Sequence, residues 1–117
     1  MSDFPTYCAR TSAKLWREMS EYLSLGSEAS QWLSELLSST SRSFIRDGLA
    51  DDQVSVRNKA GWISEDGCYS TCDAGLIDVD GHSYVMSIMT SIPWSDQSSE
   101  VVAAIAKALY DVRSPLA

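Results

Sequence analysis

The chain has 117 residues, a net charge of −7 and 44% apolar residues, including four tryptophans and five tyrosines. This length fits one small domain that buries roughly two thirds of its unfolded surface, and the aromatic content is too high for a disordered chain. The acidic balance and the scattered basic residues argue against a nucleic-acid groove, and no apolar run approaches the ~20 residues of a membrane span.

Helical patterns occupy the first 50 residues. Apolar residues recur at the helical period after Thr11 and Ser12, which are candidate N-caps, and the pattern stops near Gly26. Ser27 is expected to cap a second helix, and a short third helix is expected to end near Gly48. The residues predicted to face the core from the first two helices are Leu15, Trp16, Met19, Tyr22 and Leu23, then Trp32, Leu33, Leu36 and Leu37.

Strand patterns follow. A first strand runs to a turn at Ser64–Gly67, and a second strand covers 72–79. Asp80-Gly81 is a strong signal for a two-residue hairpin. The third strand, 84–92, is apolar on both pleat faces, which predicts a strand covered on both sides, as in a central sheet position.

Pro93 ends the third strand, and Ser95 or Asp96 is expected to cap a last helix. This order predicts an α+β fold, in which a three-stranded antiparallel meander packs with N-terminal helices and with a C-terminal helix across one face. We expect a single domain, 1–117, with a helical part at 10–50, the sheet at 53–92 and the closing helix at 95–113. The predicted core face of that last helix is Val101, Val102, Ile105, Ala106, Leu109 and Val112.

Lys59, Ala60 and Gly61 lie on the first strand and precede Trp62. An ammonium group at a strand edge attracts a carboxylate and lowers the pKa of nearby proton-transfer groups. The glycine lets a ligand approach the backbone, and the next N–H can serve as an oxyanion-hole donor. The pattern therefore suits anion recognition, and the alternative is an exposed lysine that discourages pairing at a sheet edge.

This segment and the hairpin and helix after it resemble the end of the penicillin-recognising serine hydrolases, meaning class A β-lactamases and their D-Ala-D-Ala peptidase relatives. Lys59-Ala60-Gly61 stands where that family has its Lys-Thr/Ser-Gly triad. The resemblance covers about residues 10–113 and implies the C-terminal part of a partial β-lactamase/transpeptidase-like fold. It implies Lys59 and Trp62 as catalytic groups, with Lys59, Ala60 and Gly61 binding substrate. The full-length parent would act on a β-lactam or peptide-like amide or ester, without a metal or another cofactor.

The chain departs from the family pattern at two points. Ala60 lacks the hydroxyl of the usual Thr or Ser, which removes a charge-assisted hydrogen bond worth ~1.5–3 kcal/mol. The chain also lacks Ser-x-x-Lys, the motif of the nucleophile, and Ser-Asp-Asn; its nearest approach is Thr11-Ser12-Ala13-Lys14. Acyl transfer needs a nucleophile in contact with a base, so we expect the isolated chain to be inactive.

Three interpretations follow. In the first, an upstream segment complements the chain to form a serine hydrolase. In the second, the chain is a non-catalytic module that forms a homodimer or binds a partner through the surface that the missing strands would cover. In the third, it is an unrelated dimeric scaffolding domain, with Lys59 away from any cleft. The N-terminus lacks the features of a signal peptide, so we expect a cytoplasmic chain as written, whereas an exported parent would carry its signal upstream.

The remaining candidate residues favour structural roles. Cys8, Cys68 and Cys72 have poor spacing for a metal site, and small apolar or turn positions are expected for them. A Cys68–Cys72 bridge in an exported parent is the alternative. Asp73 is predicted to be structural rather than catalytic, and His82 is predicted to be a solvated turn residue.

Overall fold

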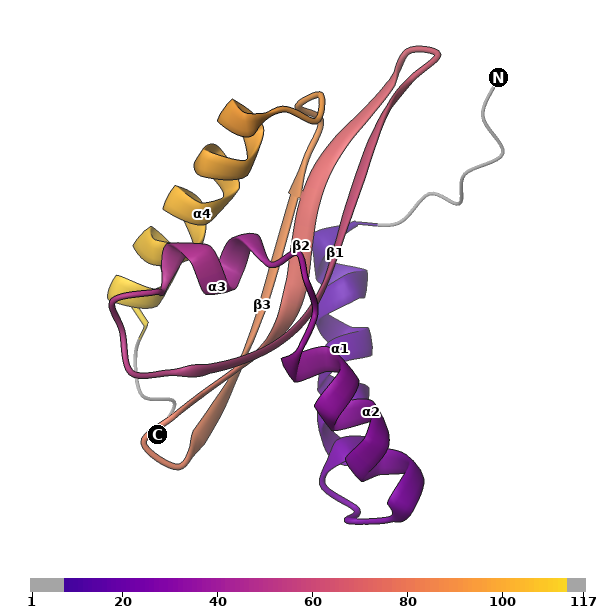
Figure 1. Cartoon of the computed structure of the whole chain (residues 1–117), viewed down its shortest axis with the longest axis vertical. Helices are drawn as coiled ribbons and strands as arrows, with labels where there is room; N and C mark the ends of the chain where they lie inside the picture. The colour runs from indigo at the N-terminus through magenta and orange to yellow at the C-terminus, as the bar shows by residue number, and fades with distance from the viewer. Residues whose placement is uncertain (1–7, 114–117) are drawn as a thin grey trace.

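A three-stranded antiparallel sheet lies between two pairs of helices (Figure 1). The computed structural model describes residues 8–113, so the N-terminal stretch examined for a signal peptide lies outside the described part. Helices α1 and α2 cover one face of the sheet, and α3 and α4 cover the other. The elements in chain order are α1 (Ala9–Leu23), α2 (Glu28–Ser38), α3 (Phe44–Gly48), β1 (Ser55–Glu65), β2 (Cys68–Val79), β3 (His82–Thr90) and α4 (Asp96–Asp111).

Serine side chains begin three of the four helices. Ser27 and Ser43 each accept a hydrogen bond from the backbone N–H three residues later, at 3.2 and 3.0 Å. Ser95 and Ser98 form a reciprocal capping box at the start of α4. The prediction for α1 was wrong: the helix begins after Cys8, so Thr11 and Ser12 already lie within its first turn.

Several predicted core residues are exposed. Trp16, Leu37 and Val102 are buried as predicted, but Leu15 of α1 and Trp32 of α2 are 53% and 62% exposed. The reason is that each helix contacts the sheet along a narrow stripe, while the described residues place no further layer on its outer side. The exposed residues of this predicted set are Leu15, Tyr22, Trp32, Leu36, Val101, Leu109 and Val112.

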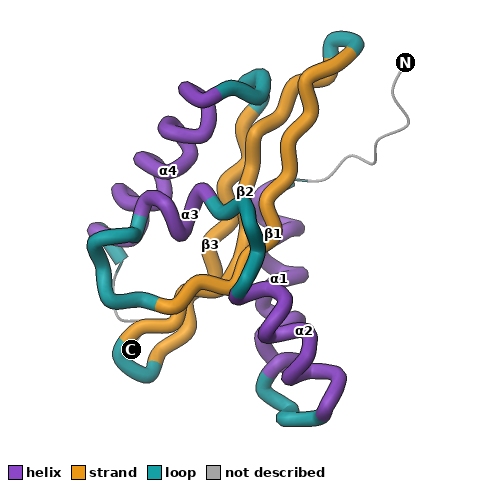
Figure 2. The backbone as a smooth tube through the Cα atoms, in the orientation of Figure 1, coloured by secondary structure: helices purple, strands orange, loops and turns teal. Residues whose placement is uncertain are grey.

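Both hairpins turn through an Asp-Gly pair. Asp66-Gly67 and Asp80-Gly81 have φ values of 49° and 75°, and of 51° and 78°, the left-handed region that such two-residue turns require. The second turn was predicted. The first is tighter than the predicted Ser64–Gly67 turn, so β2 begins at Cys68 rather than at Cys72. As a result the β1–β2 hairpin extends past the end of β3 (Figure 2).

The predicted central position of the third strand is wrong. The strand order is β1-β2-β3, so β2 is central and β3 lies at an edge. Helix α1 packs on one face of β3 and α4 packs on the other, which accounts for apolar residues on both faces. Apolar residues on both faces indicate that other elements pack above and below a strand. They do not give its place in the strand order, because hydrogen-bonded neighbours lie at its sides.

No disulfide bond joins Cys68 to Cys72. The two residues are four apart on the same extended strand, which separates their Cα atoms by about 13 Å. A disulfide requires Cα atoms closer than ~7 Å, so the bridge suggested as an alternative does not fit this strand.

Gly75 of β2 marks a close approach between strands. A Cβ atom there would lie 2.2 Å from the Arg57 carbonyl oxygen of β1, whereas one at Gly61 would lie 3.4 Å from the Cys72 sulfur. We predict that Gly75→Ala lowers the free energy of unfolding by about 1–3 kcal/mol, because the strand backbones must separate. Gly61→Ala should change it far less. Urea unfolding of both variants checks this, and equal losses would contradict it.

Candidate functional site

No strand in residues 8–113 pairs with the outer edge of β1. Arg46 donates a hydrogen bond to the Val56 oxygen at 2.9 Å, and the Lys59 ammonium donates to the Ala60 oxygen at 2.9 Å. On β2, the Thr71 oxygen accepts from the Thr90 hydroxyl and so points toward β3. Thr71 lies opposite Trp62. Because backbone groups alternate along a strand, the N–H groups of Ala60 and Trp62 point to the open edge.

Lys59 lies on the α1 side of this edge and lines a cavity. The cavity has a volume of about 410 Å³ and lies between α1 and the sheet. Lys59 is exposed, and its ammonium makes no ion pair with a carboxylate in the described residues. The cavity is lined by Leu15, Trp16, Met19, Leu37, Lys59, Ala60, Gly61, Cys72, Asp73, Ala74 and Met89. Most of these residues are apolar, and Lys59 is the one basic residue among them.

A buried polar network holds β1 against α3. The Asp73 carboxylate accepts from the Ile45 N–H at 3.0 Å and from the Asn58 amide at 2.8 Å. The Asn58 oxygen accepts from the Thr40 hydroxyl and from the Arg46 guanidinium. Asn58 and Asp73 are almost fully buried, so each of these bonds replaces one that water would make. The network fixes the strand that carries Lys59.

The buried Asp73 carboxylate depends on its hydrogen-bond donors to remain charged. Burial raises the pKa of this carboxyl group above its ordinary value of 3.8, while the Ile45 N–H and the Asn58 amide oppose that rise. Its position at the start of α3 also suits a negative charge. These contacts account for a structural role, as predicted from the sequence. Asn58 and Arg46 were not singled out there, although a buried-strand asparagine is itself a signal, since strands are poor in Asn.

Trp62 contributes a side chain as well as its N–H. Its ring stacks on Trp94, with 5.1 Å between the ring centroids, and the Trp94 ring packs against Phe44 at 5.8 Å. The Arg42 guanidinium lies 4.9 Å from the Trp94 centroid and 5.7 Å from that of Trp62. Trp62 remains 43% exposed, so this cluster forms a wall at the open edge.

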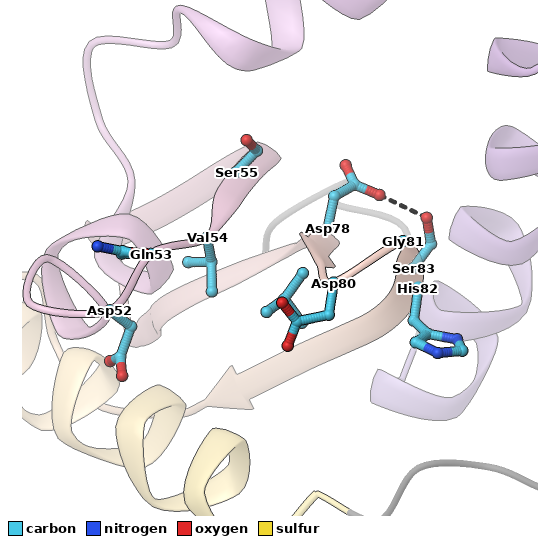
Figure 3. A pocket seen from close by; sticks show the side chains of 10 residues that line it. Asp52, Gln53, Val54, Ser55, Asp78, Asp80, Gly81, His82 and Ser83 are labelled. Atoms are coloured by element: carbon cyan, nitrogen blue, oxygen red, sulfur yellow. Dashed lines mark hydrogen bonds between the residues drawn. The ribbon is translucent and has the colours of Figure 1, made fainter.

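A second depression lies at the opposite end of the sheet, around the β2–β3 turn (Figure 3). It contains Asp52, Asp78 and Asp80 together with the exposed His82. Arg57 pairs with Asp78 at 2.9 Å and Lys107 pairs with Asp52 at 3.0 Å. Within residues 8–113 no group of three acidic, histidine or cysteine side chains is placed to hold a metal ion. These contacts are those of a solvated, ion-paired surface.

The comparison with known proteins decides the family. Residues 2–112 match the family Beta-lactamase2, described as the β-lactamase enzyme family. The chain belongs to this family. No curated protein matches the chain. None of the helices within residues 8–113 has the length and hydrophobicity of a membrane span.

Two solved structures share the fold of this β-lactamase-family chain. One is PBP-A, at 23% identity and a TM-score of 0.69, and the other is a PBP-A mutant in an acyl-enzyme complex with penicillin G, at 19% and 0.67. Each match covers 87% of this chain and 38% of the other, so the chain spans about two fifths of PBP-A. The predicted α+β class and the predicted resemblance to part of a penicillin-binding protein are confirmed.

The buried network yields a direct stability test. Asp73→Ala leaves the Ile45 N–H without an acceptor and removes one of the two acceptors of the Asn58 amide, and we predict a loss of about 2–4 kcal/mol in the free energy of unfolding. Asp78→Ala is the matched control on the same strand. It removes a partly exposed ion pair with Arg57 and should cost about 0–1 kcal/mol. Urea unfolding measures both losses. Similar values would show that the buried hydrogen bonds of Asp73 stabilise the fold no more than the partly exposed ion pair does.

Proposed function

We propose that the chain is the C-terminal portion of a serine hydrolase that cleaves an amide or ester through a serine acyl-enzyme. The observation that carries the proposal is the open edge of β1, with Lys59 beside an apolar cavity, in a chain of the β-lactamase family. A PBP-A mutant that shares this fold forms an acyl-enzyme with penicillin G. A β-lactam or peptide-like amide is therefore the substrate class we propose.

Each group at the edge has a proposed task. The Lys59 ammonium provides positive charge for a substrate carboxylate and for nearby proton transfer. The Trp62 N–H stabilises the oxyanion of the tetrahedral intermediate together with the N–H of the nucleophile. Gly61 leaves room for the substrate to lie along the backbone. Ala60 supplies no hydroxyl, so the substrate carboxylate needs another donor.

The nucleophile is proposed to come from a segment outside these 117 residues, because they contain no Ser-x-x-Lys. Thr11 and Lys14 are exposed on α1, and the Thr11 hydroxyl contacts Cys8 rather than the lysine. The cavity between α1 and the sheet lies beside Lys59 and is open to such a segment. In this arrangement the chain supplies electrostatic stabilisation and its partner supplies the attacking group.

The test is intact-mass spectrometry after incubation with benzylpenicillin. We predict no adduct on the chain alone, and a stoichiometric adduct on a serine of a co-expressed upstream segment of a family member that carries Ser-x-x-Lys. Lys59→Ala should slow its formation by about tenfold or more, as expected for loss of a charge-assisted contact, while the exposed Lys14→Ala should not. An adduct on a serine of this chain would contradict the proposal that the nucleophile comes from another segment. The absence of any adduct in the mixture would contradict the proposed serine hydrolase.

A second candidate function is a non-catalytic homodimer, and the β3 edge favours it. β3 contains no Asp, Glu, Lys or Arg, whereas β1 carries Arg57, Lys59 and Glu65. Edge strands without charge are templates for pairing. A groove of about 310 Å³ runs from β3 to α4. Exposed apolar residues of this helix and its C-cap form a stripe that continues the groove, namely Val101, Leu109 and Val112. Two copies related by a two-fold axis would join their β3 strands into one sheet and bring both stripes together.

Sedimentation velocity tests this candidate. The homodimer predicts that the chain sediments as a dimer and that Val85→Lys, which places a charge on the β3 edge, yields a monomer. Tyr69→Lys is the control, because this exposed residue precedes the part of β2 that pairs with β3. A monomeric wild-type chain would exclude the homodimer and leave the β3 edge to a complementing segment.

A further inference from the structure

Helix α1 is held to the sheet by apolar contacts alone. Trp16 and Leu23 are buried against β2, and Met19 packs beside them. Within residues 8–113 no hydrogen bond or ion pair joins α1 to a strand. The other three helices each have such a bond, namely Arg57 to Ser34 of α2, Ile45 of α3 to Asp73, and Thr71 to Ser98 of α4. The position of α1 is therefore the least constrained of the four.

Two buried serine hydroxyls weaken the docking of α1 further. Ser12 of α1 is fully buried, and neither its hydroxyl nor that of Ser87 on β3 has a hydrogen-bond partner in the described residues. Ser12 lies one helical turn before Trp16, and Ser87 pairs with Ala74, which belongs to the same apolar cluster as Trp16. Both hydroxyls therefore face the layer between α1 and the sheet. Each would regain bonds to water if α1 moved away, so each favours the detached helix.

The packing and the ends of α1 add little stability. The cavity of about 410 Å³ lies between α1 and the sheet, and side chains that line a cavity have no partner atoms on that side. The N-cap residue Cys8 makes no side-chain capping bond. The first turn contains no acidic residue and the last turn contains no basic residue, so the helix dipole is not compensated at either end.

The connection between α1 and α2 has the properties of a hinge. Gly26 has a φ of 74°, and no atom lies within 4 Å of the position that a Cβ would take there. Leu25 beside it is exposed. The turn projects away from the sheet, at the lower right of Figure 1. A glycine in open space absorbs a change of backbone angle, while the bond of Ser34 to Arg57 keeps α2 on the sheet.

We propose that α1 is a hinged cover, which detaches from the sheet by rotation about residues 24–27 while the rest of the described chain stays folded. Its detachment widens the access to the cavity beside Lys59. The proposal goes beyond the proposed function, because it concerns access to the cavity and applies equally to a hydrolase and to a non-catalytic chain.

The experiment is amide hydrogen exchange of the folded chain at low urea concentrations. The amides of Trp16 and Met19 report on α1, and those of Leu76 and Ile77 report on the central strand. We expect the α1 amides to exchange at least tenfold faster and with a weaker dependence on urea, because local opening exposes less surface than global unfolding. Ser12→Ala should slow α1 exchange by about fivefold or more, since it removes a buried hydroxyl without a partner.

Three further variants separate this effect from others. Ser87→Ala should also slow α1 exchange, although it lies on β3 and leaves the helix sequence unchanged. Ser20→Ala on α1 gives the gain in helix propensity alone, about twofold. Ser30→Ala removes an equally buried hydroxyl that donates to the Ser27 oxygen at 2.9 Å, and it should not slow α1 exchange.

Three results of this experiment would overturn the proposal. The first is wild-type α1 amides that exchange as slowly as those of β2. The second is an equal effect of Ser12→Ala and Ser20→Ala. The third is faster α1 exchange in Ser12→Ala, which would show that the hydroxyl of Ser12 stabilises the docked helix.

Alkylation of Cys72 tests whether the movement of α1 opens the cavity. Cys72 lines the cavity, and its thiol donates to the Gly61 oxygen at 3.3 Å. We expect iodoacetamide to modify Cys72 about fivefold more slowly in Ser12→Ala, and the exposed Cys8 at an unchanged rate, as read from peptide masses. An unchanged Cys72 rate in a variant with slower α1 exchange would show that α1 does not cover the cavity. Neither measurement depends on acylation, so the cover and the hydrolase are tested independently.

Discussion

The buried Asp73 carboxylate is the contact on which the rest of the structure depends. It joins the start of α3 to the middle of the sheet through Ile45 and to β1 through Asn58. Arg46 continues the network to the carbonyl oxygen of Val56. A carboxylate buried to this degree is costly unless each of its oxygens has donors. Satisfying it fixes the segment before β1 and the strand itself, and so determines where Lys59 and Trp62 lie.

The two edges of the sheet differ in a way that follows from charge. The β1 edge carries Lys59, Glu65 and the adjacent Arg42, which oppose pairing with another strand and favour a charged ligand. The β3 edge carries no Asp, Glu, Lys or Arg and borders an apolar groove. One edge is therefore suited to recognition of a small anion and the other to the addition of a strand.

Local patterns predicted the elements well, because their signals are local. The Ser27 and Ser95 caps and the Asp80-Gly81 turn each act within a few residues, and the structure has them where the sequence places them. The position of β3 and the exposure of Trp32 could not be predicted in this way, since they depend on which layers exist around each element. Likewise, the contacts of Asn58 and Arg42 involve residues far away in sequence, whereas Lys59, Ala60 and Gly61 are consecutive.

The roles assigned to the outer edge of β1 require that the N–H of Trp62 points away from β2. Residue-by-residue amide hydrogen exchange measures this most directly. We expect fast exchange for Ala60 and Trp62 and slow exchange for Gly61 and Ile63, because alternate N–H groups pair with β2. Protection of the Trp62 amide equal to that of Gly61 would contradict this orientation, since the Trp62 N–H would then not face a ligand at this edge.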